Sequence, residues 1–380
     1  MRKYELTLTS SYVQDWNFPM AIRELIQNGV DQETVNPNAA FTIEYVDGFI
    51  RFTNRNTRLR CNTLLLGRSS KQRSDETVGQ FGEGYKIAAL VLTRLGKPFV
   101  IHNNGKNEVW TCRFVNSQRW AERILTFFVE DLPSPSDDLV IEVGNVTEDE
   151  WESLSDIWLG FQDYQAIDTS YGQILTDEDQ KDRVYVNGLY IQCNSSMEYG
   201  YNFKPEYLTL ERDRKSCSSW DAERITSKMI QEAQEKGLLS DEAVYEMLEE
   251  GKDDISNAGW GLDGEQREQM AEKFMAAFDE KHQDDFDTDI PEAKRVPIPV
   301  SGTSDYKKVT AYGGNPVFVP STTHRLVDHI AEQRMKDLMD CSMESETLTL
   351  KEQLERWKDF YSDYLPNGAV EELETILSQM

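Results

Sequence analysis

The pattern of hydrophobic and polar positions predicts a mixed α and β fold for the first part of the chain. Alternation at 4–9 predicts a strand, whereas Pro19 opens a helical pattern that continues to about Asp31. The segment 41–54 predicts a β-hairpin, because its central Asp-Gly pair is a preferred two-residue turn. A helical run at 87–95 follows a glycine-rich loop.

Further β signals follow this helical run. Strand-like segments are found at 98–103, 108–115, 124–129 and 139–143. Thr147 begins a capping-box pattern that predicts a helix through about Leu159. An Asn187-Gly188 turn inside the segment 182–193 predicts a second hairpin.

From Trp220 onward the pattern of hydrophobic and polar residues predicts amphipathic helices. Helices are expected at 222–236, 241–250 and about 264–281, and again at about 346–364 and 368–379. Between these two groups of helices the sequence predicts a strand, a turn and one further helix. The stretch 286–302 is acidic and then proline-rich, which predicts a linker. We therefore expect an acidic helical region at 221–285 and a small α/β-helical element at 303–380.

Composition places the chain among globular proteins. Hydrophobic residues make up 39% of it and aromatic residues 11%. No apolar run is long enough to predict a membrane span, and the start of the chain lacks the apolar core of a secretion signal. The five cysteines are scattered and form no C-x-x-C pair, so a reducing cytoplasm is the expected compartment.

The net charge of −28 is unevenly distributed along the sequence. Residues 1–130 hold 17 Lys and Arg against 13 Asp and Glu, whereas residues 131–380 hold 23 against 55. Direct nucleic-acid binding by 131–380 is disfavoured, because an acidic surface repels phosphates. The acidity is explained either by a solvated surface or by a surface that binds a basic protein partner or mimics DNA.

A helix over 21–32 would separate apolar from polar side chains. With Glu24 at zero, Asn28 lies at about +40° and Asp31 at about −20°, while the apolar residues lie between about 100° and 240°. An ordinary surface helix explains this pattern, and so does a binding site that presents a carboxylate, an amide and a second carboxylate.

The segment 77–86 (TVGQFGEGYK) favours the second explanation. Its three glycines precede a helix, and such loops let backbone N–H groups approach phosphates. Lys86 follows the glycines, and a run of Arg and Lys free of acidic residues precedes them. This basic run either steers a triphosphate or forms a solvated surface.

Together these two segments resemble the GHKL ATPases, which include gyrase B subunits, MutL, the large cytosolic heat-shock chaperones and MORC proteins. Glu24-x-x-x-Asn28-x-x-Asp31 resembles their first motif, and Gly79-x-Phe81-Gly82-x-Gly84-x-Lys86 resembles their later glycine motif. The close resemblance covers about residues 15–100.

The resemblance implies a role for each matching residue. Glu24 would be the general base and Asn28 the Mg²⁺ ligand. Asp31 and Asn54 would contribute to nucleotide binding. The phosphate-binding loop would comprise Gly79, Phe81, Gly82, Gly84 and Lys86, the last also assisting catalysis, and Ser70 and Lys71 would lie at the start of its lid.

The chain departs from the family at the base-recognition motif. The family has Asp-x-Gly-x-Gly, whereas here Asn54 stands in place of the Asp and both glycines are absent. An Asn oxygen can accept a hydrogen bond from adenine, but its amide can also donate to guanine O6, so base specificity stays open. The family's Gly-Thr motif on a late strand is absent as well.

A second resemblance concerns residues 161–220. The segments 184–191 and 209–216 resemble the transducer domain of MutL and gyrase, in which a basic residue contacts the γ-phosphate. Arg212 and Arg214 are the candidates for this catalytic role, together with Lys204 and Lys215. A surface pair with neighbouring carboxylates explains the same arginines equally well.

The sequence therefore predicts an α+β protein with a Bergerat α/β-sandwich ATPase domain at 1–160, a transducer-like α/β domain at 161–220 and an acidic, mostly helical remainder. The resemblance implies Mg²⁺-dependent ATP binding and slow hydrolysis, coupled to lid closure and to a homodimer or another partner. The alternatives are a nucleotide sensor that does not hydrolyse, and an acidic interaction protein or DNA mimic that acts through 221–380.

Overall fold

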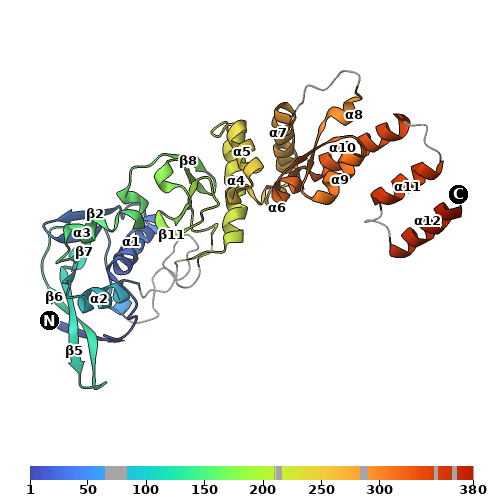
Figure 1. Ribbon diagram of the computed structural model, residues 1–380. Coiled ribbons are helices and arrows are strands. Elements are labelled where there is room, and N and C mark those ends of the chain that lie inside the picture. Colours follow the sequence, from blue (N-terminus) through green and yellow to red (C-terminus); the bar gives the residue numbers. More distant parts are fainter. Residues whose placement is uncertain are drawn as a thin grey trace. The chain divides into compact units, whose positions relative to one another are not determined.

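The computed structural model describes residues 1–64, 84–208, 210, 216–282, 290–345, 350–361 and 366–379 (Figure 1). The chain divides into two compact units, Met1–Ala222 and Glu223–Met380. The first unit therefore contains both the predicted ATPase domain and the predicted transducer-like domain. Each unit is described separately below.

A seven-stranded antiparallel sheet forms the larger part of the first unit. Its strands, in spatial order, are β1 (Arg2–Thr9), β6 (Glu122–Asp131), β5 (Glu108–Ser117), β4 (Phe99–Asn103), β7 (Leu139–Val143), β3 (Phe49–Asn54) and β2 (Phe41–Val46). All seven strands match segments that the alternation predicted. The Asp47-Gly48 turn is confirmed, with both residues at positive φ, 50° and 79°.

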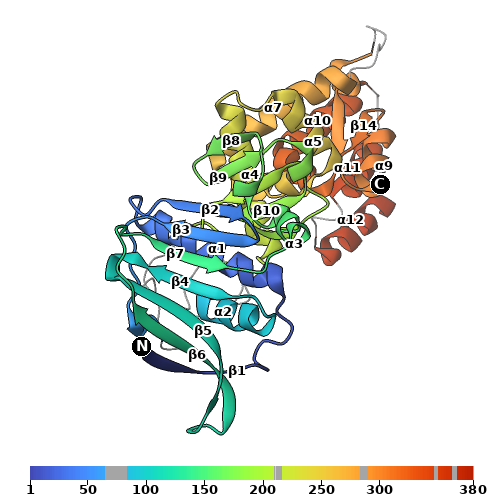
Figure 2. The same cartoon turned by 90° about the vertical axis from the view of Figure 1, so that its left-hand side faces the viewer.

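Two helices cover one face of this sheet (Figure 2). Helix α1 (Phe18–Val35) packs over β2 and β3, and α2 (Gly84–Arg94) packs over β4 and β5. The core between helices and sheet is aliphatic and aromatic, with Ile22, Ile26, Leu90, Ile101, Trp110 and Phe127 all fully buried. This core fixes α1 and α2 side by side, as their mutual packing shows.

A second sheet of five strands completes the first unit. Its spatial order is β11 (Leu189–Cys193), β10 (Arg183–Val186), β12 (Gly200–Phe203), β9 (Gly172–Leu175) and β8 (Ala166–Thr169), with β10 and β12 parallel and the other pairs antiparallel. The predicted Asn187-Gly188 hairpin is confirmed. Strands β8, β9 and β12 were not predicted, because four residues are too few to show a period.

The hairpin of the second sheet contacts α1. Arg23 donates from Nη2 to the carbonyl of Tyr190 at 3.3 Å, and Asn187 donates from Nδ2 to Oγ1 of Thr34 at 3.2 Å. Leu189 belongs to the same hydrophobic core as α1. The second sheet is therefore packed against the helix that carries Glu24 and Asn28.

The helix predicted after Thr147 is shorter than expected. The capping box is present, but α3 spans only Glu148–Glu152. Trp158 is extended and packs edge-on against Phe161, with ring centroids 5.1 Å apart. The next amide, that of Leu159, donates to the carbonyl of Gly188 at 2.8 Å. These tertiary contacts replace the helical hydrogen bonds that a helix through Leu159 would need.

The second unit is mostly helical, as predicted. Its helices are α4 (Ser219–Glu235, which begins just before the boundary), α5 (Asp241–Glu250), α6 (Ala258–Gly261), α7 (Gly264–His282), α8 (Glu292–Arg295), α9 (Thr303–Ala311), α10 (Ser321–Ser345), α11 (Leu350–Tyr361) and α12 (Asn367–Gln379). Gly237 and Gly251 follow α4 and α5 at φ of 67° and 68°, where the sequence placed the helix ends. None of the helices within the described ranges has both the length and the apolar character of a membrane span.

Part of the predicted linker 286–302 belongs to the core of this unit, which corrects the prediction. Strand β13 (Pro297–Val300) pairs in parallel with β14 (Asn315–Phe318). Ile298 and Val300 are 2% exposed and pack with Leu338 of α10. Proline is compatible with the edge of so small a sheet, so the proline-rich composition misled the prediction.

Candidate functional site

Helix α1 carries buried polar side chains beside its apolar side. Its N-terminus is capped by Asn17, whose Oδ1 accepts a hydrogen bond from the Met20 amide at 3.1 Å. Glu24 is 5% exposed and Asp31 is fully buried, while Asn28 is half-buried. An ordinary surface helix would leave these groups in water, because burying a charge carries a large desolvation cost. The burial of these side chains therefore favours a binding site over an ordinary solvent-exposed helix face.

Gly84 lies directly against Glu24 and Asn28. A Cβ atom added to Gly84 would overlap Oε2 of Glu24 and lie 3.1 Å from Nδ2 of Asn28. The two motifs, distant in sequence, therefore meet at the start of α2. Carboxylate and amide oxygens suit a hard cation such as Mg²⁺, and a glycine at the start of a helix leaves the backbone accessible. These residues fit the group of ligands that the sequence implied, a nucleotide with its magnesium ion.

Asn28 is held within its own helix by a side-chain hydrogen bond. Its Nδ2 donates to the carbonyl of Glu24, one turn earlier. Because the amide nitrogen faces the helix backbone, the amide oxygen is directed away from that carbonyl. The oxygen is the atom that a magnesium ion would need.

Two residues in the first turn of α2 contact Thr63. Lys86 is fully buried, and its Nζ donates to the Thr63 carbonyl at 2.8 Å. The hydroxyls of Tyr85 and Thr63 are hydrogen-bonded at 3.0 Å, and burial raises the pKa of Tyr85 above its ordinary value. Lys86 therefore links the first turn of α2 to Thr63 from within the core. The predicted residues Ser70, Lys71, Gly79, Phe81 and Gly82 lie outside the described residues.

Asn54 at the end of β3 uses its amide nitrogen to bind α1 and the following turn. Its Nδ2 donates to the carbonyls of Gly29 at 2.9 Å and Ala39 at 3.1 Å. Carbonyl oxygens only accept, so the nitrogen must be the atom that faces them. The Oδ1 atom of Asn54 therefore does not face these carbonyls, and it can only accept hydrogen bonds.

Gly29 is needed for this arrangement. A Cβ atom at this position would overlap the ring of Phe41 on β2. The absence of a side chain therefore lets α1 approach the sheet closely enough for Asn54 to reach its backbone.

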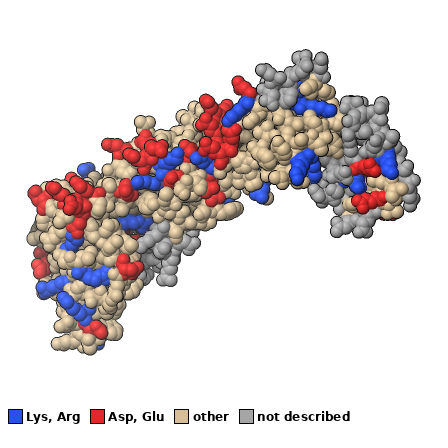
Figure 3. All heavy atoms as spheres, viewed as in Figure 1, with Lys and Arg blue, Asp and Glu red and all other residues tan. Residues whose placement is uncertain are grey.

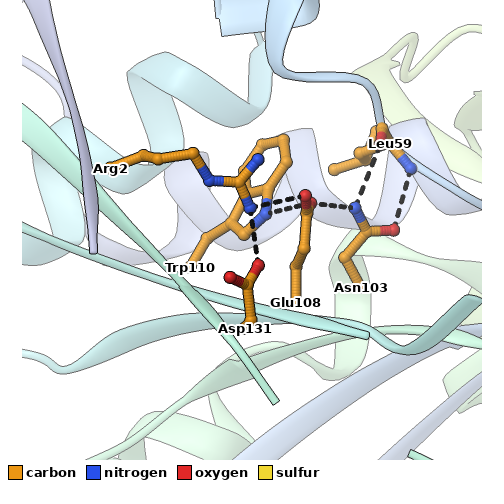
Figure 4. A network of polar contacts seen from close by, with 6 residues as sticks. All are labelled: Arg2, Leu59, Asn103, Glu108, Trp110 and Asp131. Atoms are coloured by element: carbon orange, nitrogen blue, oxygen red, sulfur yellow. Dashed lines mark hydrogen bonds and ion pairs between the residues drawn. The ribbon is translucent and has the colours of Figure 1, made fainter. Parts of the chain in front are cut away.

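A buried polar network anchors the segment that leads into the glycine-rich loop (Figure 4). Asn103 accepts from the Leu59 amide at 3.1 Å and donates to the Leu59 carbonyl at 3.0 Å. Glu108 accepts from Asn103 at 3.1 Å, from the Trp110 indole at 2.9 Å and from Arg2 at 2.8 Å. Burial raises the pKa of Glu108, but the hydrogen bonds from Trp110 and Arg2 outweigh this, so its pKa is lowered.

The basic run before the loop is partly paired at the surface. Arg51 binds Glu142 at 2.8 Å, and Arg58 binds Asp137 at 2.7 Å. For these two arginines the simpler explanation, a solvated face, accounts for what is seen. Arg55 and Arg60 are exposed as well, and the other members, Arg68, Lys71 and Arg73, lie outside the described residues.

Of the basic residues proposed for the transducer-like region, Lys204 is the one that the structure describes. It is exposed and donates to the Ser170 carbonyl at 2.8 Å. Arg212, Arg214 and Lys215 lie outside the described residues. Their predicted role near the γ-phosphate stays a prediction.

The described part of the chain contains no group of three or more His, Cys, Asp or Glu side chains able to hold a metal ion.

Sequence reasoning missed four residues that the structure places at or behind this site: Gln27, Thr63, Tyr85 and Asn103. For Gln27 a signal was present, since it lies about 60° from Glu24 on the helical projection. Thr63, Tyr85 and Asn103 are ordinary residues whose partners are set by the tertiary fold.

The family match described next begins within α3 and ends just after α4. A family model described as the Mycoplasma pneumoniae MPN635 N-terminal domain matches residues 149–236, which include the second sheet. An uncharacterized protein of Mycoplasma pneumoniae (strain ATCC 29342 / M129 / Subtype 1) is 23% identical over 228 residues, which cover 57% of this chain and 92% of that protein. The chain is similar to both over these regions, and their descriptions state no activity.

Proposed function

We propose that residues 1–222 bind ATP with Mg²⁺ and hydrolyse it slowly, in a fold of the Bergerat type. The observation that carries the proposal is the contact of Gly84 with Glu24 and Asn28, which unites the two sequence motifs. An antiparallel sheet with α1 and α2 on one face, and the burial of Glu24 and Asp31, support it further.

Each residue has a defined task in this proposal. ATP would supply the phosphoryl group, and a bound Mg²⁺ ion would supply positive charge near the phosphates. Glu24 accepts the proton of the attacking water, for which a carboxylate within hydrogen-bond reach is required. Asn28 offers its amide oxygen to the cation. Asn54 accepts a hydrogen bond from the adenine amino group.

Isothermal titration calorimetry tests binding first. Wild type and Asn28→Ala are titrated with ATP, GTP and a non-hydrolysable ATP analogue, with Mg²⁺ and with a chelator. The proposal expects saturable ATP binding that needs Mg²⁺ and is lost in Asn28→Ala. Absence of binding in wild type would refute it.

Phosphate release tests hydrolysis separately. Glu24→Gln should bind ATP like wild type but hydrolyse it at least about a hundredfold more slowly, because it cannot accept a proton. ATP binding without any phosphate release by wild type would instead favour a nucleotide sensor. Coupling to lid closure and to a homodimer stays a prediction, because residues 65–83 lie outside the described part.

An acidic surface on the second unit favours one further candidate function, binding of a basic protein. Helix α5 carries Asp241, Glu242, Glu246, Glu249 and Glu250, and acidic side chains gather over this region (Figure 3). Lys273 and Lys281 of α7 pair with Asp241 and Glu249 at 2.9 and 2.5 Å, and Lys252 pairs with Glu250 at 3.0 Å, whereas Glu242 and Glu246 form no ion pair with the described residues. Histones, as basic proteins, are tested for capture by the immobilised full chain and by its Glu242→Lys/Glu246→Lys variant. The variant should capture less histone, and equal capture by both would contradict this candidate function.

A further inference from the structure

Gln27 on α1 is buried without hydrogen-bond partners. Its side chain is 1% exposed, and neither Nε2 nor Oε1 has a partner. Leaving a buried amide group unpaired destabilises the folded state, because its hydrogen bonds to water are lost without replacement. Native proteins pair nearly all such groups with protein atoms or with ordered water, so this amide calls for a specific explanation.

The position of Gln27 on the helix supplies the context. Glu24 lies three residues earlier and Asp31 four residues later, and side chains at these spacings are neighbours on a helix. Both carboxylates are buried, at 5% and 0% exposure. The amide therefore lies next to the residue proposed as the general base.

A buried water is the partner that fits these groups. An amide offers donors and an acceptor, and a carboxylate can accept several hydrogen bonds at once. A water held by Gln27 Nε2 can donate a hydrogen bond to the carboxylate of Glu24. Buried waters are found at polar sites of this kind, where they bond to about three partners.

We propose that Gln27 positions the attacking water of ATP hydrolysis next to Glu24. This inference rests on the proposed function. The water attacks the γ-phosphorus, the bond to the bridging oxygen breaks, and Glu24 takes the proton of the water, so that ADP and phosphate are the products. Gln27 gains and loses no atom in this step. It acts as a positioning residue by fixing the water through a hydrogen bond.

Gln27→Met tests this role, because Met has a similar volume and shape without the amide. Its kcat should fall about tenfold to hundredfold, while KM and the affinity for ATP stay within about twofold. The urea midpoint without nucleotide should be unchanged or raised, because two unpaired polar atoms are removed. Gln32→Met, the same change on the same helix, is the matched control and should behave like wild type.

A double-mutant cycle identifies the shared target. If Gln27 and Glu24 act on one water, Glu24→Gln/Gln27→Met should be no slower than Glu24→Gln alone. A high-resolution crystal structure of the wild type should show an ordered water within hydrogen-bond distance of Gln27 Nε2 and the Glu24 carboxylate.

Three results would overturn the inference. They are a wild-type kcat for Gln27→Met, a loss confined to ATP affinity, and a failure of this variant to fold, since that would mean the amide has structural partners. Failure of the proposed function itself is distinguishable, because wild type would then not bind ATP in the calorimeter.

Discussion

Gly84 at the first position of α2 is in contact with the carboxylate of Glu24 on α1, and a side chain at position 84 would overlap it. The relationship requires glycine for a steric reason. It also links the proposed base to the end of the glycine-rich loop, so that a change at one residue is expected to disturb the other.

Substitution of Gly84 by Ala should impair the site without unfolding the protein. The added methyl group would displace the Glu24 carboxylate, whereas Ala is well accepted in a helix. We expect ATP binding, hydrolysis or both to fall at least about tenfold, because small misplacements of catalytic groups are costly. Calorimetry and phosphate release measure this.

Gly264→Ala is the matched control for that variant. Gly264 also begins a helix, but a Cβ atom there would meet nothing within 4 Å. It should bind and hydrolyse ATP like wild type. If Gly84→Ala did the same, the contact would have no role in the site.

ATP should bind at least about tenfold more tightly than GTP, because a site built to accept a hydrogen bond rejects a ligand that cannot donate one. The Nδ2 atom of Asn54 donates to the carbonyls of Gly29 and Ala39. In the proposed site the Oδ1 atom, which can only accept, would therefore be the one that contacts the base. Adenine presents an amino donor, whereas guanine presents the acceptor O6. Competition of unlabelled ATP and GTP against a fluorescent ATP analogue measures the ratio. Equal affinities for ATP and GTP would mean that Asn54 does not distinguish adenine from guanine.

Asn54→Asp should destabilise the fold although it restores the residue found in the GHKL ATPases. A carboxylate oxygen would face the carbonyls of Gly29 and Ala39, and two donors would be lost. We expect a loss of at least about 2 kcal/mol in urea unfolding. Asn56→Asp is the control, because the exposed side chain of Asn56 makes a single longer bond, at 3.3 Å to the Asn38 carbonyl. Its effect should stay within about 0.5 kcal/mol.

Stability should depend on pH through Glu108. Its folded-state pKa is lowered from 4.5, so its contribution is fully present above that value and is lost as the pH falls through the folded pKa. Urea unfolding from about pH 7 down to about pH 3 should therefore show a fall that is smaller in Glu108→Gln. This variant should also be about 1 kcal/mol less stable at neutral pH, because Arg2 loses one of its two charged partners and keeps only Asp131.

Glu142→Gln serves as the comparison for Glu108. Its partner Arg51 is 45% exposed, so this pair is screened by solvent and should contribute less than about 0.5 kcal/mol. Identical pH profiles of wild type and Glu108→Gln would exclude Glu108 as the titrating group.

Local signals were sufficient to predict much of the first unit. The Asp47-Gly48 and Asn187-Gly188 turns need positive φ, which few residues adopt readily, so the hairpins could be predicted from four residues. The two faces of α1 followed from helical periodicity. The end of α3 could not be predicted, because Trp158 and Leu159 leave the helical path to bind groups far away in sequence.

The sequence by itself determined which residues lie on the polar side of α1 and which segments pair as hairpins, because these depend on neighbours only a few residues apart. The tertiary structure alone decided that Gly84 meets Glu24, that Lys86 is buried against Thr63 and that Asn54 directs its oxygen away from α1. It also placed Pro297–Val300 in a core instead of a linker. These relationships join segments remote in the chain, and their geometry is fixed by how helices and sheet pack together.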